Sequence, residues 1–399
     1  MKKIAIVVQR CHEQVVGGSE AEAWHYANLL KSNYEIHILT TTAVDFERWD
    51  NVLAEGDEIR EKICIKRFRV SQGRADYWEE IRRQLLDEFA GFKYKSNIST
   101  KLVKRLNELP TALQEEFIYK QGPYSDDLMS FLSERSYDYK AIIFLTYLYP
   151  TTYFGMFHVP NEKIIFVPTL HDEPTAYLSV YKYMAKRSRT ILWNTDSECR
   201  FGRLLWGELP GCVVGIGVET KEFPPAKLNF PYMLYCGRID INKGCPQLMD
   251  YFLRYKEGCP SDLRLVLTGD NKIELPHNRD IIFKGSVSEE EKLNLMNGAS
   301  FFVMPSPNES FSIVTLEAMA QKTPVLASDG SEVVVEHIRK SGGGLLYSNY
   351  DSFKDGINFL LENEQKTKDM GESGRKYVIK NYGTKKISKK LNDIIEAIK

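Results

Sequence analysis

The sequence alternates between short apolar runs and helical stretches, and this alternation is the feature that most limits its possible folds. It opens with an apolar run at 4–8, a loop containing Gly17 and Gly18, a segment at 20–32 with apolar residues at helical spacing, and a second apolar run at 35–41. A strand, a loop, a helix and a strand in this order are typical of a parallel α/β unit. Runs that are apolar throughout predict strands buried on both faces of a sheet. Further runs of this kind lie at 140–149, 163–170, 189–195, 211–218, 232–239, 263–270, 280–287, 299–307, 323–329 and 343–347.

The pattern falls into two halves. At 399 residues, of which 43% are hydrophobic, the chain is long enough to bury two separate cores. The stretch 219–231 contains three prolines and no periodicity, and it predicts a linker between the halves. We therefore expect an N-terminal Rossmann-like domain at 1–218 and a C-terminal one at 232–383. The helical segment at about 384–399 is expected to pack back onto the first domain.

A stretch at about 76–136 interrupts the alternation. Its segments 77–92, 99–109 and 125–136 are long, charged and amphipathic, a pattern that predicts helices without strands. We interpret it as a helical insertion in the first domain.

The overall charge of the chain is close to zero. Lys and Arg number 53 and Asp and Glu 54, so no net charge draws the chain to nucleic acid or to an anionic membrane. Lys-rich segments at 101–106 and 385–399 are typical of solvated helix faces, and peripheral contact with the inner face of a membrane is the alternative for them. No 18 uncharged apolar residues run together, and the apolar run near the N-terminus is too short for a signal peptide. A cytoplasmic protein is expected.

Seven scattered cysteines include no C-x-x-C pair, which is typical of reduced, mostly buried thiols rather than of a disulfide framework or a zinc site. We expect no metal and no required cofactor.

The segment 305–329 carries the strongest functional signal. Pro305 and Pro307 keep the chain out of a helix, so Glu309 is expected in a loop at the end of a strand, with a helix starting near 310–312. Glu317 then lies one to two turns inside that helix. A helix start suits a diphosphate, and a carboxylate further along can accept paired ribose hydroxyls. The pattern favours a nucleotide site, although two isolated glutamates at this spacing are far more often solvated helix charges.

With this motif the chain resembles the retaining GT-B glycosyltransferases of the large family 4, in which two glutamates stand eight positions apart between a strand and a helix. The family's donor-binding basic pair is matched by Arg238 and Lys243, and its active-site histidine by His171. The resemblance implies a GT-B fold, in which two Rossmann-like domains face each other across a cleft.

The resemblance also implies the roles of these residues. Arg238 and Lys243 would stabilise the departing diphosphate, Glu309 would position the donor sugar, Glu317 would hold the ribose, and His171 would act at the reacting centre. A surface ion pair for either basic residue and a buried, hydrogen-bonded histidine remain the structural alternatives. The other residues implied in donor or nucleotide binding are Gly17, Gly18, Ser310, Phe311, Ser312, Ile313, Gly285 and Val287.

Some of these positions depart from the family pattern or carry a weaker signal. Ser310 and Ser312 stand where many members have glycine, which adds hydroxyls near the donor sugar. Gly17 and Gly18 also fit a plain tight turn, while the G-x-G at 215–217 lacks the rest of a dinucleotide fingerprint.

The function implied is the metal-independent transfer, with retention, of a sugar from a UDP- or GDP-sugar to a hydroxyl of a glycan or lipid-linked glycan in surface polysaccharide biosynthesis. Two alternatives are a different GT-B enzyme, such as a nucleotide-sugar epimerase, and a non-catalytic nucleotide-sugar-binding protein.

Overall fold

A computed structural model describes residues 1–12, 17–86, 105 and 108–398. The chain forms two compact units. The first comprises Met1–Ile216 and Ile387–Lys399, and the second Gly217–Lys386. The first unit is therefore discontinuous in sequence, with the whole of the second unit between its two parts.

The first unit is built on an eight-stranded sheet with the order β3-β4-β2-β1-β5-β6-β7-β8. The run from β4 to β7 has the strand order of a Rossmann fold, and every pair in it is parallel. β3 pairs antiparallel with β4 at one edge, and β8 extends the other edge in parallel. The strands are β1 Lys3–Val7, β2 Glu35–Thr41, β3 Gly56–Arg60, β4 Ile63–Phe68, β5 Tyr139–Leu145, β6 Ile164–Val167, β7 Thr190–Trp193 and β8 Gly211–Val213.

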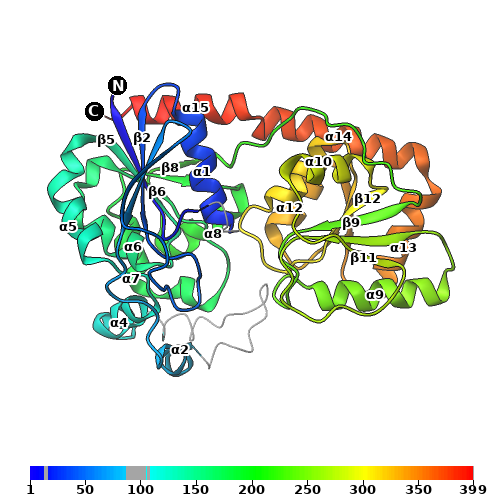
Figure 1. Ribbon diagram of the computed structural model, residues 1–399, viewed down its shortest axis with the longest axis horizontal. Helices are drawn as coiled ribbons and strands as arrows, with labels where there is room; N and C mark the ends of the chain where they lie inside the picture. Colours follow the sequence, from blue (N-terminus) through cyan, green and yellow to red (C-terminus); the bar gives the residue numbers. More distant parts are fainter. Residues whose placement is uncertain (13–16, 87–104, 106–107, 399) are drawn as a thin grey trace. The chain divides into compact units, whose positions relative to one another are not determined.

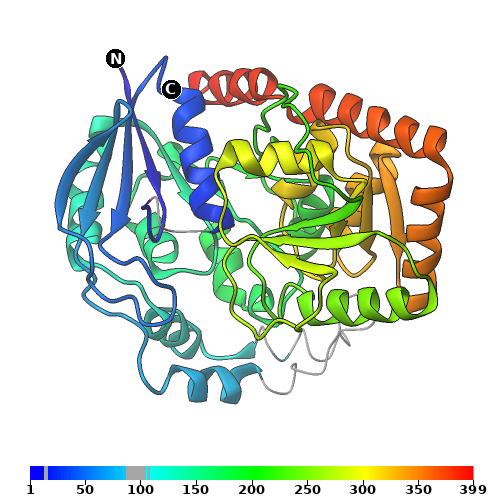
Figure 2. The ribbon, with the colours of Figure 1, turned by 45° about the vertical axis from the view of Figure 1, so that its right-hand side comes forward.

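Helices cover both faces of this sheet (Figure 1). α1 (Gly18–Leu30) and α15 (Thr384–Glu396) pack on one face, where Ile387, Leu391 and Ile395 of α15 join the core. The ends of the chain lie near each other on this unit in both views (Figures 1 and 2), and the Lys140 ammonium donates to the Ile398 carbonyl at 2.5 Å. The helices of the opposite face are α2 Trp78–Leu86, α4 Thr111–Gln121, α5 Asp126–Arg135, α6 Pro150–Tyr153, α7 Ser179–Ala185 and α8 Asp196–Trp206.

The sequence pattern missed the hairpin of β3 and β4. β3 is almost entirely exposed, so it lacks the apolar run that marks a central strand. In the predicted insertion, α2 and α5 are helical as expected, and α4 is a further helix between the segments predicted at 99–109 and 125–136. Residues 87–104 and 106–107, which include most of the helix predicted at 99–109, lie outside the described residues.

The second unit has a six-stranded sheet that is parallel throughout. Its order is β11-β10-β9-β12-β13-β14, again that of a Rossmann fold. The strands are β9 Tyr232–Cys236, β10 Arg264–Thr268, β11 Ile281–Phe283, β12 Phe301–Met304, β13 Val325–Ser328 and β14 Gly344–Tyr347. Each lies inside a predicted apolar run.

Two layers of helices enclose this sheet (Figure 1). On one side lie α9 (Cys245–Gly258) and α13 (Tyr350–Glu362), whose apolar residues share one core with the strands. On the other side lie α10 (Glu289–Gly298), α11 (Ile313–Ala320), α12 (Glu332–Ser341) and α14 (Glu364–Tyr382). The proline-rich segment is tied to this unit, because the Gln321 side chain accepts from the Phe223 amide at 2.9 Å and donates to the Lys221 carbonyl at 2.9 Å.

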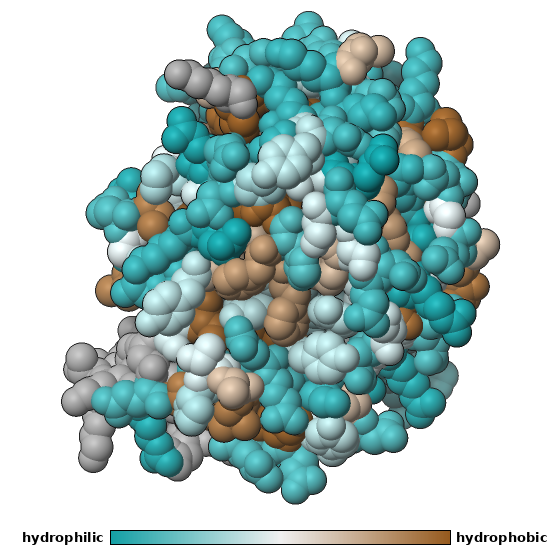
Figure 3. Space-filling view, turned by 90° about the vertical axis from the view of Figure 1, so that its left-hand side faces the viewer, coloured by the Kyte–Doolittle hydropathy of each residue, from teal (hydrophilic) through white to brown (hydrophobic). Residues whose placement is uncertain are grey.

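Hydrophilic side chains cover most of the face of the first unit shown in Figure 3, with apolar ones in small groups among them. Within the described part of the chain, no helix is both long enough and apolar enough to span a bilayer. All seven cysteines are free thiols, and Cys212 is the exposed one among them.

Candidate active site

The second unit brings two predicted site segments together at one point of its sheet. β9 and β12 are adjacent, but the chain leaves them toward opposite edges, and parallel α/β sheets bind ligands where the strand order reverses in this way. Gly244, with φ +73, approaches so closely that a Cβ there would lie 2.7 Å from the Pro305 carbonyl oxygen. The loop after β9 therefore lies directly against the loop after β12.

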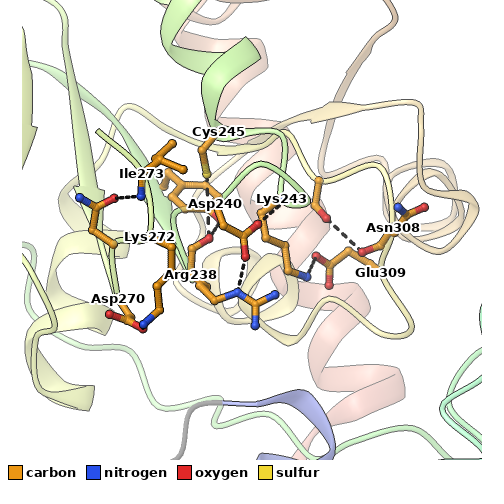
Figure 4. A network of polar contacts seen from close by, with 12 residues as sticks. Arg238, Asp240, Lys243, Cys245, Asp270, Lys272, Ile273, Asn308 and Glu309 are labelled. Atoms are coloured by element: carbon orange, nitrogen blue, oxygen red, sulfur yellow. Dashed lines mark hydrogen bonds and ion pairs between the residues drawn. The ribbon is translucent and has the colours of Figure 1, made fainter. Parts of the chain in front are cut away.

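Arg238, Lys243 and Glu309 meet at this contact (Figure 4). The Lys243 ammonium lies 2.6 Å from Oε1 of Glu309. Asp240, which the sequence did not single out, organises the loop: Oδ1 accepts from the Lys243 amide at 2.8 Å, and Oδ2 pairs with Nε of Arg238. Two half-buried cations thus lie close together, Arg238 paired with Asp240 and Lys243 with Glu309, and the two cations can bind a diphosphate.

The loop after Glu309 ends in an unusual backbone conformation. Ser312 is the N-cap of α11 and has φ +59 and ψ +59, a left-handed conformation that glycine adopts without cost. Its hydroxyl lies 2.8 Å from the Thr315 hydroxyl. Phe311 is buried, while Ser310 and Ile313 are half-buried.

Buried His337 contacts the backbone of this loop, and no sequence pattern pointed to it. Its Nε2 lies 3.0 Å from the Phe311 carbonyl oxygen, and its Nδ1 lies 3.0 Å from the Tyr377 hydroxyl. Burial lowers the pKa of His337 to about 4, so the ring is neutral at pH 7 and Nε2 or Nδ1 carries a single proton.

Glu317 lies in α11 as expected, but it is buried against a partner that was not expected. Its Oε2 is 2.8 Å from the ammonium of Lys292, in the second turn of α10. Burial raises the pKa of Glu317, and the Lys292 charge opposes that shift. For Lys292, burial favours the neutral form, but Glu317 and Glu289 outweigh it and raise the pKa. The Lys292 ammonium is therefore charged. A ligand bound by Glu317 would also lie close to this ammonium.

Gly285 and Val287 lie in the loop between β11 and α10. Gly285 has φ +70, and its carbonyl accepts from the Gly269 amide at 2.9 Å. The loop therefore joins the strand end of β10 to the helix that carries Lys292.

In the first unit, His171 lies in the loop after β6, and its Nε2 is 3.4 Å from Oε1 of Glu173. The Tyr147 hydroxyl donates to the same oxygen. Burial would raise the pKa of Glu173, but the neighbouring His171 and Tyr147 outweigh it and lower that pKa. The Glu173 carboxylate is therefore ionised and lies next to the His171 ring.

Gly17 and Gly18 stand at the start of α1. A Cβ at Gly17 would lie 2.0 Å from Oε2 of Glu20, whereas one at Gly18 would meet nothing within 4 Å. Arg10 and Gln9 hold Glu20 in place, with Nε of Arg10 at 2.5 Å from its Oε1. A carboxylate already lies against this helix start, so an incoming phosphate would have to displace it.

Comparison with known proteins bears on the same segments. Residues 218–377 match the family described as Glycosyl transferases group 1. The second unit is a glycosyl transferases group 1 domain. The matched region includes Arg238, Lys243, Glu309 and Glu317, whereas Gly17, Gly18 and His171 lie in the first unit, outside it.

Curated relatives match this chain over part of their length. Alpha-1,3/1,6-mannosyltransferase ALG2 of Candida albicans is 30% identical over 131 residues, 31% of this chain and 30% of the relative. Alpha-maltose-1-phosphate synthase of Mycobacterium tuberculosis is 27% identical over 225 residues, 47% of this chain and 56% of the relative. The chain thus spans from under a third to just over half of these relatives.

Solved structures match along the whole chain. Sucrose-phosphate synthase from Thermosynechococcus elongatus has a TM-score of 0.69 at 16% identity and covers 100% of this chain and 99% of its own. Anabaena HepE, solved with UDP and glucose, has a TM-score of 0.68 at 13% identity and covers 100% of both chains. At these identities the likeness shows the fold, which is GT-B.

Proposed function

We propose that this GT-B glycosyltransferase moves a sugar, with retention of anomeric configuration and without a metal, from a UDP- or GDP-sugar to a hydroxyl of a glycan or lipid-linked glycan. The observation that carries the proposal is the meeting of Arg238, Lys243 and Glu309 where the strand order of the second sheet reverses. Surface polysaccharide biosynthesis is the process in which we place it.

The charges at this point suit a leaving diphosphate. As the glycosidic bond breaks, negative charge builds on the diphosphate, and fixed cations stabilise it more than they stabilise the intact donor. Because Asp240 already orients Arg238 and the Lys243 backbone, little reorganisation is needed when that charge develops. Lys243 exchanges Glu309 for phosphate oxygens, which frees the Glu309 carboxylate to accept from sugar hydroxyls.

Glu317 is proposed to hold the ribose, beside Lys292. Gly285 and Val287 are proposed to line the base pocket through backbone groups, and Ser310, Phe311, Ser312 and Ile313 to frame the sugar. His171, Gly17 and Gly18 of the first unit are proposed to serve the reacting centre and the acceptor. The structural likeness to HepE supports a nucleotide donor, since HepE was solved with UDP and with UDP-glucose.

Among the described residues, no group of three or more His, Cys, Asp and Glu could hold a metal ion. Activity measured with and without EDTA, once a donor is known, tests the proposed metal independence.

Thermal stabilisation by UDP, GDP, ADP and their common sugars tests the donor site. Ligand at about 100 times its Kd stabilises a protein by about 2.7 kcal/mol, a readily measured rise in melting temperature. We expect one nucleotide to stabilise the protein, and Arg238→Ala and Glu317→Ala to lose the effect. Lys256→Ala is the matched control, because Lys256 pairs with Asp280 at 3.3 Å in the same unit with similarly low exposure.

Turnover then separates the competing activities. Release of nucleoside diphosphate that depends on an acceptor supports transfer, whereas donor turnover without acceptor supports an epimerase. Stabilisation without any turnover supports a binding protein. If no nucleotide stabilises the wild type, the donor site is wrong.

A further inference from the structure

Two neighbouring strand ends in the first unit carry β-branched residues in a left-handed backbone conformation. Thr146 follows β5 with φ +67, and Thr169 follows β6 with φ +51. Both are buried, and their hydroxyls are 3.2 Å apart. A β-branched residue rarely adopts this conformation, and such strain persists where the surrounding structure fixes it, often at functional sites.

Backbone hydrogen bonds join the loop after β5 to the end of β6 and the residue that follows it. The Thr146 amide donates to the Val167 carbonyl at 2.9 Å, and the Tyr147 amide donates to the Pro168 carbonyl at 3.0 Å. The Tyr147 ring is fully buried and meets Tyr181 edge to face at 4.8 Å. The hydroxyl of this buried ring donates to Oε1 of Glu173.

A second buried acid fixes the backbone next to His171. Oε1 of Glu198 accepts from the Leu170 amide at 2.6 Å, and its Oε2 accepts from the Asn194 amide at 2.5 Å. Glu198 belongs to α8, so the helix start and the loop before His171 are tied to one side chain. The loop is thus held on both sides of the histidine, by Glu198 before it and by Tyr147 through Glu173 after it.

We propose that Glu173 is a positioning residue that acts through His171, a role that rests on the proposed function. Its Oε1 faces Nε2 of His171 and is itself oriented by the Tyr147 hydroxyl. A carboxylate at Nε2 fixes the ring and favours the imidazolium, which donates from both nitrogens. Nδ1 of His171 then offers a charged donor to a hydroxyl or phosphate oxygen at the reacting centre.

The charged and titratable groups around this pair come from the histidine's own loop and from three further elements. Glu173 lies in the histidine's own loop, Glu198 on α8 also acts on His171, and Tyr147 and Tyr181 face Glu173 from the end of β5 and from α7. Burial raises the pKa of Glu198 to about 8, whereas Glu173 stays charged well below that pH. Below pH 7, Glu173 is therefore the carboxylate that stabilises a protonated His171.

NMR titration of the histidines tests the pair without any activity assay. The His171 signal is identified by its loss in His171→Ala. In Glu173→Gln we expect its titration midpoint to move to lower pH by about one unit, since a nearby carboxylate favours the charged ring. Glu115→Gln is the matched control, because Glu115 accepts from Tyr153 at 2.8 Å in the same unit and should leave the midpoint unchanged. A midpoint that stays in place in Glu173→Gln overturns the proposal.

Kinetics with the identified donor give a second, independent readout. Glu173→Gln should lower kcat by roughly 10- to 100-fold with little change in KM, as for other carboxylates that orient a functional histidine. In a His171→Ala background the same change should have almost no further effect, because the residues act as a unit. Equal losses in both backgrounds would show that Glu173 does not act through His171. If no nucleotide stabilises the wild type, the proposed function is overturned instead. Failure of the Glu173 proposal and failure of the proposed function are therefore distinguishable.

Discussion

Replacement of Lys292 by methionine gives the sharpest test of the second unit's electrostatics. The ammonium is 2.8 Å from Glu317, and the two side chains are 18% and 9% exposed. Removing one partner of a buried ion pair costs about 3–5 kcal/mol, because the other charge is left without compensation. The second contact, to Glu289, adds little, since Glu289 is 69% exposed. In a domain of this size the loss corresponds to a fall in melting temperature on the order of 10 °C.

The pH dependence of this loss identifies its cause. Burial already raises the pKa of Glu317 in the folded protein, and removal of the Lys292 charge raises it further. A carboxyl group with a raised folded pKa favours the folded state below its unfolded pKa, near 4.5, and loses that contribution as the pH rises. The deficit of Lys292→Met should therefore be small at pH 5 and large at pH 8.

Urea unfolding at several pH values measures this dependence. Adding Glu317→Gln to Lys292→Met should recover much of the loss at pH 8, because no charge is then left buried. Lys322→Met is the matched control: Lys322 also contacts two glutamates, Glu222 and Glu372, each at 3.2 Å, but all three side chains are at least 36% exposed. Its cost should stay below about 1 kcal/mol. A pH-independent deficit in Lys292→Met, or one equal to the control, would refute the reasoning.

Three further predictions concern stability, each measured by urea unfolding. Ser312→Gly should change stability by less than about 1 kcal/mol, since relief of the left-handed conformation offsets the lost hydrogen bond, whereas Ser312→Val should cost about 2 kcal/mol. His337 has a pKa near 4 in the folded protein and near 6.5 in the unfolded chain, so its contribution to stability falls by about 3 kcal/mol as the pH drops through that interval. His337→Gln should make stability less dependent on pH over the same interval, and an unchanged pH dependence would contradict the assignment. Glu22 is buried with a pKa raised to about 8, so its own contribution to stability should decline from pH 5 to pH 8. Glu22→Gln should therefore gain stability relative to the wild type over this range and be the more stable protein at pH 8; equal stability there would count against it.

Sequence periodicity was sufficient for every strand of the second sheet and for the first sheet apart from β3 and β4, because strands buried on both faces must be apolar throughout. It could not find β3, whose residues face solvent. The loop position of Glu309 and the helical position of Glu317 followed from the prolines and from the helix that begins at Ile313.

The partners of these residues could not be predicted in the same way. Asp240 and Lys292 look like ordinary surface charges in sequence, and only the folded sheet brings Lys292 to Glu317. His337 lies 26 residues from its partner Phe311, in a helix whose pattern shows only a buried face. Contacts between elements distant in sequence leave no local periodicity, so tertiary structure is needed to see them.

The discontinuity of the first unit has a consequence for biosynthesis. Ile387, Leu391, Ile395 and Ile398 complete the core between α1 and the first sheet, yet the ribosome makes them only after the entire second unit. The domain that is started first is therefore finished last, the reverse of the usual N-terminal-first order. Until α15 emerges, the nascent first domain exposes an apolar surface, and this is the stage at which a chaperone would be most needed.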